Sequence, residues 1–264
     1  MVSSLQKLAL DVLGMGGVFP TASTDPRALA ELIRKLHPVE CDVPLIRLGP
    51  AGDGGYLVPD DLAGIEACFS PGVNLISGFE KECAERGMKV FLADKSVDGP
   101  AEQHESFHFV KKFVGSWSDE DFMTLDDWVG EAPIGKDSDL LLQIDIEGFE
   151  YETFLRMSDT LQRRFRVMVV EFHSMQYLWS RPFFRIASRV FEKLLKSHAC
   201  VHIHPNNDEP LVRRGSVSIP QYMEFTFHRR DRLQSPRPAR HFPHPLDGEN
   251  TNKKQMPLPA CWHA

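Results

Sequence analysis

From Pro44 to about Phe227 the sequence alternates short, continuously apolar runs with longer stretches in which apolar residues have helical spacing. Continuous apolar runs are typical of strands that are covered on both faces. The alternation therefore predicts an α/β fold in which a mostly parallel sheet carries helices on both faces. The predicted strands are Ala67 to Ser70, Lys89 to Ala93, Phe107 to Val110, Leu140 to Ile144, Val167 to Val170, Val201 to Ile203 and Met223 to Phe227.

The stretches between these strands predict helices, and the last strand departs from the alternation. Only a loop after Pro220 precedes Met223 to Phe227, so this strand is expected to be an antiparallel insertion. Gly87 is expected to end the first of the helices as a C-cap. The predicted helices are Gly78 to Arg86, Thr124 to Val129, Glu150 to Met157 and Phe183 to Ser197.

Both ends of the chain lie outside this pattern. Leu5 to Leu13 has helical spacing, and Asp25 before Pro26 predicts the capped start of a second helix that runs to about Leu36. From Gln234 onward Pro, Asn, Lys and His dominate, so we expect an extended tail that either wraps the domain or is mobile. The expected division is a helical extension at 1–43, a main domain at 44–230 and a Pro-rich tail at 231–264.

Composition excludes several classes of protein. The 264 residues are 42% hydrophobic and 25% charged, which is ordinary for a globular protein, and no internal repeat is present. No run reaches the roughly 18 apolar residues of a membrane-spanning helix, and the start lacks the features of a signal peptide. Five cysteines without a C-x-x-C spacing favour neither a disulfide framework nor a zinc site. We expect a cytoplasmic protein.

The charge is unevenly distributed along the chain. The formal net charge is −7, and residues 211–264 carry nine Lys and Arg against four Asp and Glu, which leaves an acidic body. An acidic body argues against nucleic acid as a partner. The basic end either contacts an anionic substrate or is a solvated tail.

The site of an open α/β sheet lies beyond the carboxyl ends of its strands, near the point where the strand order reverses. Polar segments follow the predicted strands at this edge. They are residues 70–74, 94–96, 115–117, 145–148, 171–173 and 204–207.

Residues 141–154, LLQIDIEGFEYETF, are the most informative of these segments. An apolar strand delivers Asp145 and Glu147 to its end, Gly148 permits the turn, and Glu150 starts a helix. Two carboxylates this close could hold a divalent cation, bind a cationic group or share a proton. The alternative is that Glu147 caps the helix and only Asp145 faces the site.

Glu171 and His173 end the next predicted strand, share a face of it and are expected beside Asp145. A histidine in this place could deprotonate a hydroxyl group near neutral pH or ligate a metal, or it could be structural.

His202 and His204 also share a strand face. A metal pair is conceivable, but no third ligand stands nearby. We favour a substrate-side loop in which Asn206 and Asn207 bond the backbone in a turn.

Three further features concern a bound cofactor. The turn S-P-G-V-N at 70–74 lacks the G-x-G-x-x-G spacing, which argues against a nicotinamide or flavin, although Gly72 would let the backbone approach a ligand. Asp94 is placed to bond the hydroxyl groups of a ribose, or is a turn aspartate. The glycines around Asp53, with Tyr56 after them, form a Gly-rich turn or a lid over the cofactor.

Taken together, these residues resemble the FkbM-type branch of class I S-adenosylmethionine-dependent methyltransferases, including relatives with a methyltransferase-like-24 type domain. The resemblance spans about residues 44–230. It rests on GDGGYLVPDDL at 52–62, the segment 68–94, FMTLDDWV with LLQIDIEGFEYETF at 122–154, and VVEFH, HIHPNN and YMEFTFHR between 169 and 229.

The resemblance implies a seven-stranded, Rossmann-like sheet with an antiparallel last strand and helices on both faces. It also implies S-adenosyl-L-methionine as the cofactor, with Asp145 among the residues around it. By position, Ser70, Gly72 and Asn74 would face the methionine end of the cofactor, Asp94 the ribose, and Ser116 with Trp117 the adenine, while Asp53, Gly54 and Tyr56 would close over it. The first motif departs from the family in having one glycine where two or three are common.

The expected reaction is methylation of a hydroxyl group on a sugar, glycolipid or small metabolite. A sulfonium methyl group is already activated, so catalysis needs alignment and removal of the acceptor's proton. Our hypothesis is that His173 is the base and that Asp145 and Glu171 position the hydroxyl or a divalent cation that lowers its pKa. The alternatives are a metal-dependent hydrolase built on Asp145, Glu147, Glu171 and His173, and a catalytically silent α/β binding module.

Overall fold

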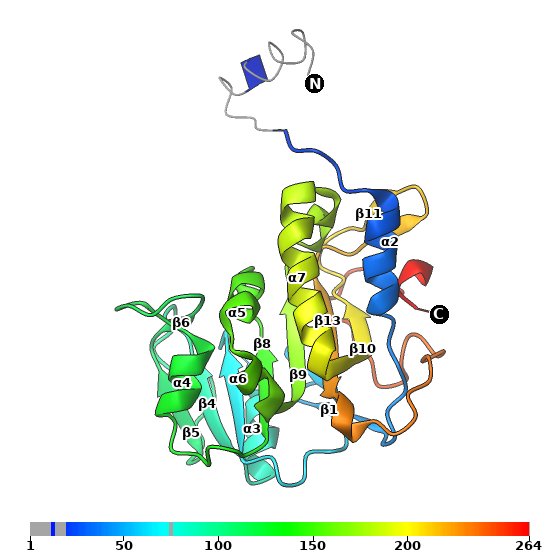
Figure 1. The fold of residues 1–264 in the computed structure, drawn as a ribbon. Coiled ribbons are helices and arrows are strands. Elements are labelled where there is room, and N and C mark those ends of the chain that lie inside the picture. The colour runs from blue at the N-terminus through cyan, green and yellow to red at the C-terminus, as the bar shows by residue number, and fades with distance from the viewer. Residues whose placement is uncertain (1–11, 14–19, 74–75, 264) are drawn as a thin grey trace.

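A seven-stranded sheet forms the centre of the molecule in the computed structural model, which describes residues 12–13, 20–73 and 76–263 (Figure 1). The strand order is β10-β13-β9-β8-β3-β4-β5, and β13 lies antiparallel between β9 and β10. The predicted fold class is confirmed, including the antiparallel last strand. The strands are β3 (Ala67–Pro71), β4 (Lys89–Ala93), β5 (Phe107–Val110), β8 (Leu140–Ile144), β9 (Phe165–Phe172), β10 (His198–Pro205) and β13 (Met223–Arg229).

The central strands are buried along their whole length, as their apolar runs predict. Every residue of β3, β8, β9 and β10 is buried. Strands β9, β10 and β13 are longer than predicted because polar residues interrupt their apolar runs and find partners inside. For example, a ring nitrogen of His198 lies 2.7 Å from the carbonyl oxygen of Phe165, and Arg166 pairs with Asp139.

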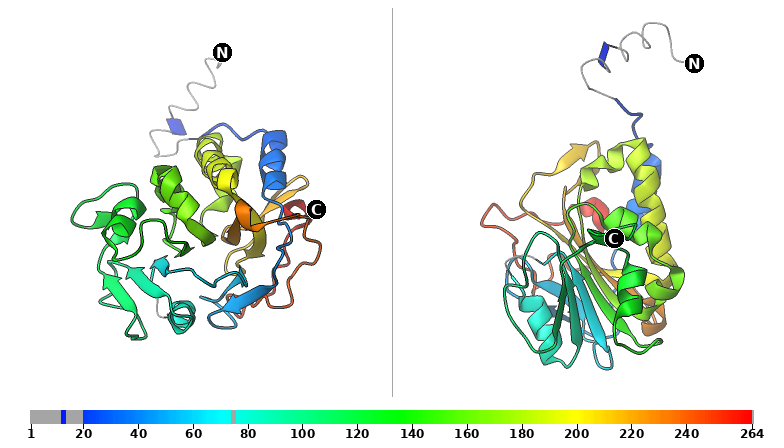
Figure 2. Two further views of the ribbon diagram at one scale, coloured as in Figure 1. Left: turned by 60° about the horizontal axis from the view of Figure 1, so that its bottom comes forward. Right: turned by 90° about the vertical axis from the view of Figure 1, so that its left-hand side faces the viewer.

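Helices cover both faces of the sheet, and each face has its own hydrophobic cluster (Figure 2). One face carries α2 (Pro26–Lys35), α4 (Leu125–Glu131), α5 (Glu150–Arg156), α6 (Asp159–Arg164) and α7 (Arg181–Ser197). The other face carries α3 (Gly78–Glu85) and the hairpin of β1 (Leu45–Leu48) and β2 (Tyr56–Pro59).

The predicted helix boundaries agree with the structure to within a few residues. The Asp25 side chain caps α2 by accepting a hydrogen bond from the backbone N–H of Arg27, at 2.9 Å. Gly87 follows α3 with a φ of +86°, as expected for a C-cap. The predicted helix from Leu5 to Leu13 lies outside the described residues, apart from 12 and 13.

Several short elements were not predicted, because they are too short to show a period. They are α6, the β1–β2 hairpin, the hairpin of β11 (Val212–Arg214) and β12 (Val217–Ile219), the pair β6 (Phe113–Val114) and β7 (Phe122–Met123), and the 3-10 turns Met175–Trp179, Arg230–Arg232 and Ala260–Trp262.

The described part of the C-terminal tail wraps the domain, which is one of the two expected outcomes. Trp262 is fully buried, packs against Phe225 at a ring distance of 6.0 Å, and donates a hydrogen bond to the carbonyl of Ser218. Helix α2 shares the same cluster through Leu29 and Ile33. The division of the chain at residues 44 and 231 stays a prediction.

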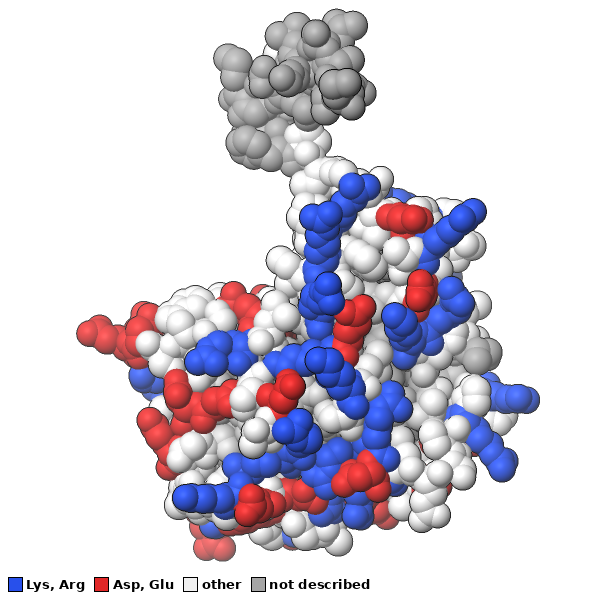
Figure 3. Space-filling model, viewed as in Figure 1, with Lys and Arg blue, Asp and Glu red and all other residues white. Residues whose placement is uncertain are grey.

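Basic residues are not confined to the tail. In Figure 3 they run along the part of the surface where Figure 1 shows α7, which contains Arg181, Arg185, Arg189, Lys193 and Lys196. Within the described part of the chain, every helix is too short or too polar to cross a membrane.

Candidate functional site

A cavity of about 460 Å³ lies at the carboxyl ends of β3, β4 and β8. The chain order reverses between β3 and β8, so this is where an open α/β sheet binds its ligand. The volume is within the range of about 300–1,000 Å³ typical of small-molecule sites. The cavity is lined by Gly72, Val73, Ala93, Asp94, Ser96, Val97, Phe113, Val114, Phe122, Asp145, Ile146, Glu147 and Phe149.

Gly72 brings the ends of β3 and β8 together. Its φ is +90°, and a Cβ atom there would lie 1.6 Å from the carbonyl oxygen of Asp145. Its backbone N–H bonds the carbonyl of Ala93 at 3.0 Å. Only glycine permits this approach, because any side chain would displace the backbone that carries Asp145.

Asp94 directly follows β4 and lines the cavity, at the sheet edge where the sequence predicted it. Its contact with a ribose stays a prediction. Its Oδ1 accepts hydrogen bonds from both the backbone N–H and the hydroxyl of Ser96, each at 2.7 Å. These two bonds fix the orientation of the carboxylate.

Three phenylalanines form an aromatic wall of the cavity that sequence reasoning missed. The rings of Phe113 and Phe122 lie 5.4 Å apart, and those of Phe122 and Phe149 lie 5.6 Å apart. Phe149 is part of the D-x-E-G-F-E segment, so its position directly after the turn was a usable signal.

The residues expected at the adenine do not line the cavity. The Ser116 hydroxyl donates to Glu152 Oε1 at 3.1 Å. Trp117 is 42% exposed and packs against Phe122 at a ring distance of 4.4 Å. Trp117 therefore lies behind the aromatic wall.

His173 follows β9 and lies between three carboxylates. Its Nε2 is 3.6 Å from Asp145 Oδ1 and 3.4 Å from Glu147 Oε2. Its Nδ1 is 3.0 Å from Oε1 of Glu150, which is fully buried. Because a carboxylate accepts, Nδ1–H donates to Glu150, and Nε2 faces the other two acids.

Glu150 was expected only to start a helix, yet it organises the whole turn. Its Oε1 accepts hydrogen bonds from the backbone N–H groups of Ile146 and Gly148, at 3.1 and 3.0 Å, besides the bond from His173. The turn and the imidazole are thus fixed by one buried carboxylate.

The environment shifts two pKa values in this cluster. Burial disfavours the charged form of His173, but the hydrogen bond to Glu150 and the charges of Glu150, Asp145 and Glu147 outweigh it and raise the pKa. Burial raises the pKa of Asp145 to about 7, against the opposing charge of His173 and with help from the neighbouring carboxylates. Asp145 can therefore exchange a proton near neutral pH.

Asp145, Glu147 and His173 could also hold a divalent cation. One ligand atom from each lies within 4.8 Å of the others, and among the described residues they are the one such group. Glu147 has a φ of +56° and a side chain that is 86% exposed, while Phe149 occupies the N-cap position of α5. The alternative in which Glu147 caps that helix is therefore wrong.

Glu171 and His173 have different hydrogen-bond partners. Glu171 Oε1 accepts a hydrogen bond of 2.8 Å from Asn206. Burial raises its pKa well above the usual value, and the charges of Asp145 and Glu224 add to this shift. The four-residue cluster that the hydrolase alternative requires is thus not assembled, because Glu171 is absent from the group that could hold a cation.

The loop before β2 lies beside the cavity without lining it. Gly54 faces Ile76 in the segment after β3, where an added Cβ would lie 3.2 Å from the Ile76 side chain. The buried Tyr56 hydroxyl accepts a hydrogen bond of 3.4 Å from Gln143. Asp53 Oδ1 lies 3.4 Å from Nδ2 of Asn250.

Of the residues expected to face the methionine end of the cofactor, Ser70 does not line the cavity and Asn74 cannot be placed. The hydroxyl of Ser70 is fully buried, 2.5 Å from Glu80 Oε1 and 2.6 Å from Gln143 Oε1, so its side chain faces α3 rather than the cavity. Asn74 lies outside the described residues.

The histidines of β10 meet the tail, which the sequence did not reveal. His202 Nε2 lies 2.9 Å from Asp247 Oδ1, and His204 Nδ1 lies 3.7 Å from Asp247 Oδ2. The expected turn is present, since Asn206 Oδ1 accepts a hydrogen bond from the backbone N–H of Asp208.

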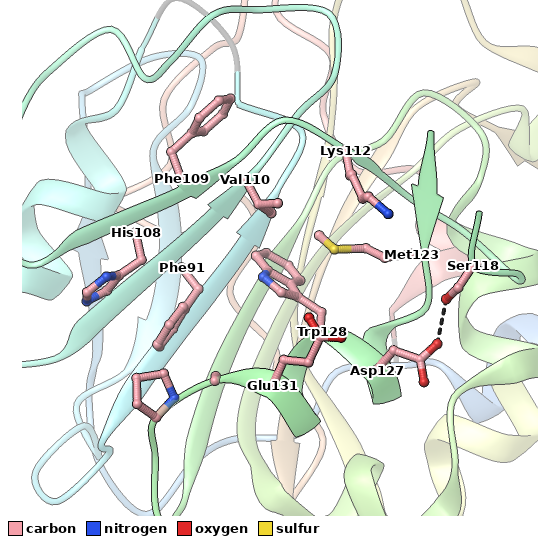
Figure 4. A pocket seen from close by; sticks show the side chains of 12 residues that line it. Phe91, His108, Phe109, Val110, Lys112, Ser118, Met123, Asp127, Trp128 and Glu131 are labelled. Atoms are coloured by element: carbon pink, nitrogen blue, oxygen red, sulfur yellow. Dashed lines mark hydrogen bonds between the residues drawn. The ribbon is translucent and has the colours of Figure 1, made fainter. Parts of the chain in front are cut away.

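A second cavity, of about 340 Å³, lies between β4, β5 and α4 (Figure 4). Its floor is apolar, with Phe91 and Trp128. Asp127 accepts from the hydroxyls of Ser118 and Thr124. The Asp127 carboxylate is thus already engaged, whereas the first cavity adjoins the cluster around His173, so we place the site in the first cavity.

Residues 80–198 match the family model described as the methyltransferase FkbM domain. The match confirms the resemblance indicated by the sequence and supports S-adenosylmethionine-dependent methyl transfer as the general activity. No curated protein matches this sequence.

Two solved structures resemble this chain at low sequence identity. The N-methyltransferase NodS from Bradyrhizobium japonicum WM9 has 9% identity and a TM-score of 0.35, over 77% of this chain and 94% of that one. The 1,6-didemethyltoxoflavin-N1-methyltransferase from Burkholderia thailandensis, with bound S-adenosylhomocysteine, has 13% identity and a TM-score of 0.31, over 63% and 72%.

Proposed function

We propose that this chain, with its FkbM-type domain, methylates a hydroxyl oxygen of a sugar, glycolipid or small metabolite at the carboxyl ends of β3, β4 and β8. The observation that carries the proposal is the imidazole of His173. It is held by Glu150 through Nδ1 and directs Nε2 toward Asp145, at the edge of a cavity large enough for a small molecule.

The residues present fit S-adenosylmethionine. Gly72 lines the cavity, and Asp145 Oδ1 is a buried oxygen without a hydrogen-bond partner among the described residues. Asp145 and Gly72 would hold the methionine end, Asp94 the ribose, and the three phenylalanines the adenine. An acidic cavity suits a cationic sulfonium, and the loop with Asp53, Gly54 and Tyr56 would close over it.

When bound, the cofactor supplies a methyl group that needs no further activation. The chain's own contribution is then alignment of the acceptor and removal of its proton. We assign His173 Nε2 as the atom that takes this proton. Glu150 stabilises the imidazolium that results, and Asp145 orients the hydroxyl group.

A divalent cation would alter these roles. The group formed by Asp145, Glu147 and His173 would hold it, through two carboxylates and one imidazole. Such a cation lowers the pKa of a hydroxyl group that binds to it. His173 would then be a ligand rather than the base, so turnover would be lost with a chelator and restored with magnesium or manganese.

The experiment that tests the function is methyl transfer from labelled S-adenosylmethionine to panels of free sugars, glycolipids and small hydroxylated metabolites. We expect an O-methyl ether, identified by its NMR signal, on one class and none on nucleic acid. Label found only on nitrogen or carbon would contradict the proposal.

A further inference from the structure

The segment 246–253 of the tail crosses the carboxyl edge of the sheet beside residues 49–55, the loop before β2, which we call the cofactor loop. We call the segment 246–253 the C-terminal strap. Backbone contact with the cofactor loop is close, since a Cβ atom on Gly248 would lie 1.7 Å from the carbonyl oxygen of Ala51. Arg47 joins the two by donating to Pro50 and Gly52 in the loop, at 2.6 and 2.7 Å, and to Leu246 in the strap, at 3.2 Å.

The strap is also tied to the sheet at both of its ends. Near the start, Asp247 pairs with His202 of β10. Near the end, the Asn207 side chain donates to the carbonyls of Thr251 and Lys253, at 3.1 and 3.2 Å, and accepts from the N–H of Thr251 at 2.9 Å. These contacts fix the backbone on either side of Asn250.

Asn250 links two acids that come from distant parts of the chain. Its Nδ2 donates to Glu224 Oε1 at 2.6 Å and lies 3.4 Å from Asp53 Oδ1. Glu224 belongs to the buried start of β13, opposite Glu171 in the sheet, and Asp53 belongs to the cofactor loop. The amide is thus a contact that joins both the strap and that loop to the sheet edge.

We propose that Asn250 is a positioning residue and that the C-terminal strap completes the active site. By donating to both carboxylates it holds Asp53 and the loop before β2 against the edge that carries Asp145. The side-chain carbonyl oxygen of Asn250 is buried and has no hydrogen-bond partner among the described residues. Rotation of the amide by 180° would direct this oxygen at two carboxylates, which also accept hydrogen bonds, so the observed orientation is the favoured one.

This inference rests on the proposed function, and its test is affinity for S-adenosylhomocysteine measured by calorimetry on the full chain. Asn250→Ala should weaken binding about tenfold, the loss expected for one hydrogen bond to a charged group. The matched control is Asn252→Ala, two residues further along the strap, where the side chain is exposed. The control should bind like the unchanged chain.

A second variant separates positioning from packing. Asn250→Asp keeps the shape of the side chain but sets a third carboxylate against Glu224 and Asp53. If the residue only fills space, this variant binds normally. If it positions the loop, Asn250→Asp binds more weakly than Asn250→Ala, and the difference shrinks in high salt because the repulsion is screened.

The outcomes separate the two proposals. If the unchanged chain does not bind S-adenosylhomocysteine, the proposed function fails and this inference fails with it. If the unchanged chain binds and both Asn250 variants bind equally well with unchanged melting temperatures, the function stands and the role of Asn250 is refuted.

Discussion

At the scale of single residues, the proposed chemistry depends on one imidazole among carboxylates. His173 has a buried acid behind Nδ1 and two further acids in front of Nε2. This arrangement keeps the ring in one orientation and stabilises the imidazolium that forms when Nε2 takes a proton.

Replacement of His173 by alanine should therefore separate catalysis from binding. We expect kcat to fall by about 10²- to 10⁴-fold, the usual contribution of a general base. Affinity for S-adenosylhomocysteine, measured by calorimetry, should stay nearly unchanged. Unchanged turnover would remove His173 from the mechanism.

The pH profile tests the partnership with Glu150. A base works in its unprotonated form, so kcat should rise with pH through the pKa of His173, which lies above its usual value. Glu150→Gln removes a charge that raises this pKa but keeps an oxygen for the two backbone N–H groups. The acidic limb of the profile should move to lower pH, and a limb that stays in place would contradict the assignment.

A site residue could be predicted from the sequence when its place follows from a neighbouring strand. Asp94, Asp145 and His173 directly follow apolar strands, so strand position alone placed them at the correct edge. Glu150 and Asn250 could not be assigned from sequence, because their roles come from contacts with turns and segments that only the folded chain brings together.

At the scale of elements, the meeting of β3 and β8 creates the cavity. Four of the seven strands were predicted to within one residue. A continuous apolar run must be buried on both faces, which a strand of a doubly wound sheet provides. The aromatic wall was missed because β6 and β7 are two residues long and show no period.

Gly72→Ala should abolish affinity for S-adenosylhomocysteine and lower the melting temperature. The added methyl group has no room beside the carbonyl of Asp145. Gly87→Ala is the matched control, with a similar φ of +86° but no atom within 4 Å, and it should cost only about 1–2 kcal/mol of backbone strain. Equal effects of the two changes on binding and on melting would contradict this account.

The aromatic wall gives a second test at this scale. Phe149→Ala should weaken binding of S-adenosylhomocysteine about tenfold, as expected for loss of one ring stacked on a base. Trp117→Ala should weaken it less, because Trp117 lies behind Phe122 rather than in the cavity. A larger loss at Trp117 would restore the contact that the sequence suggested.

At the scale of the whole molecule, the tail is part of the folded domain. Its composition predicted an extended segment but gave no way to choose between a wrapped and a mobile one. The choice depends on particular long-range contacts, such as Trp262 with Ser218 and Asn207 with Thr251.

Trp262→Ala should destabilise the chain by about 3–5 kcal/mol, as removal of a buried tryptophan usually does. Trp117→Ala, at an exposed tryptophan, should cost less than about 1 kcal/mol. Urea unfolding followed by circular dichroism measures both. Similar values for the two variants would show that the tail does not contribute to the core.

The most direct test of the central claim is calorimetric titration of the full chain with S-adenosylhomocysteine, with magnesium and with a chelator. We predict binding in the micromolar range that is lost in Gly72→Ala. Binding only in the presence of magnesium would make Asp145, Glu147 and His173 a cation site. No binding under any of these conditions would contradict the assignment of the cavity to S-adenosylmethionine.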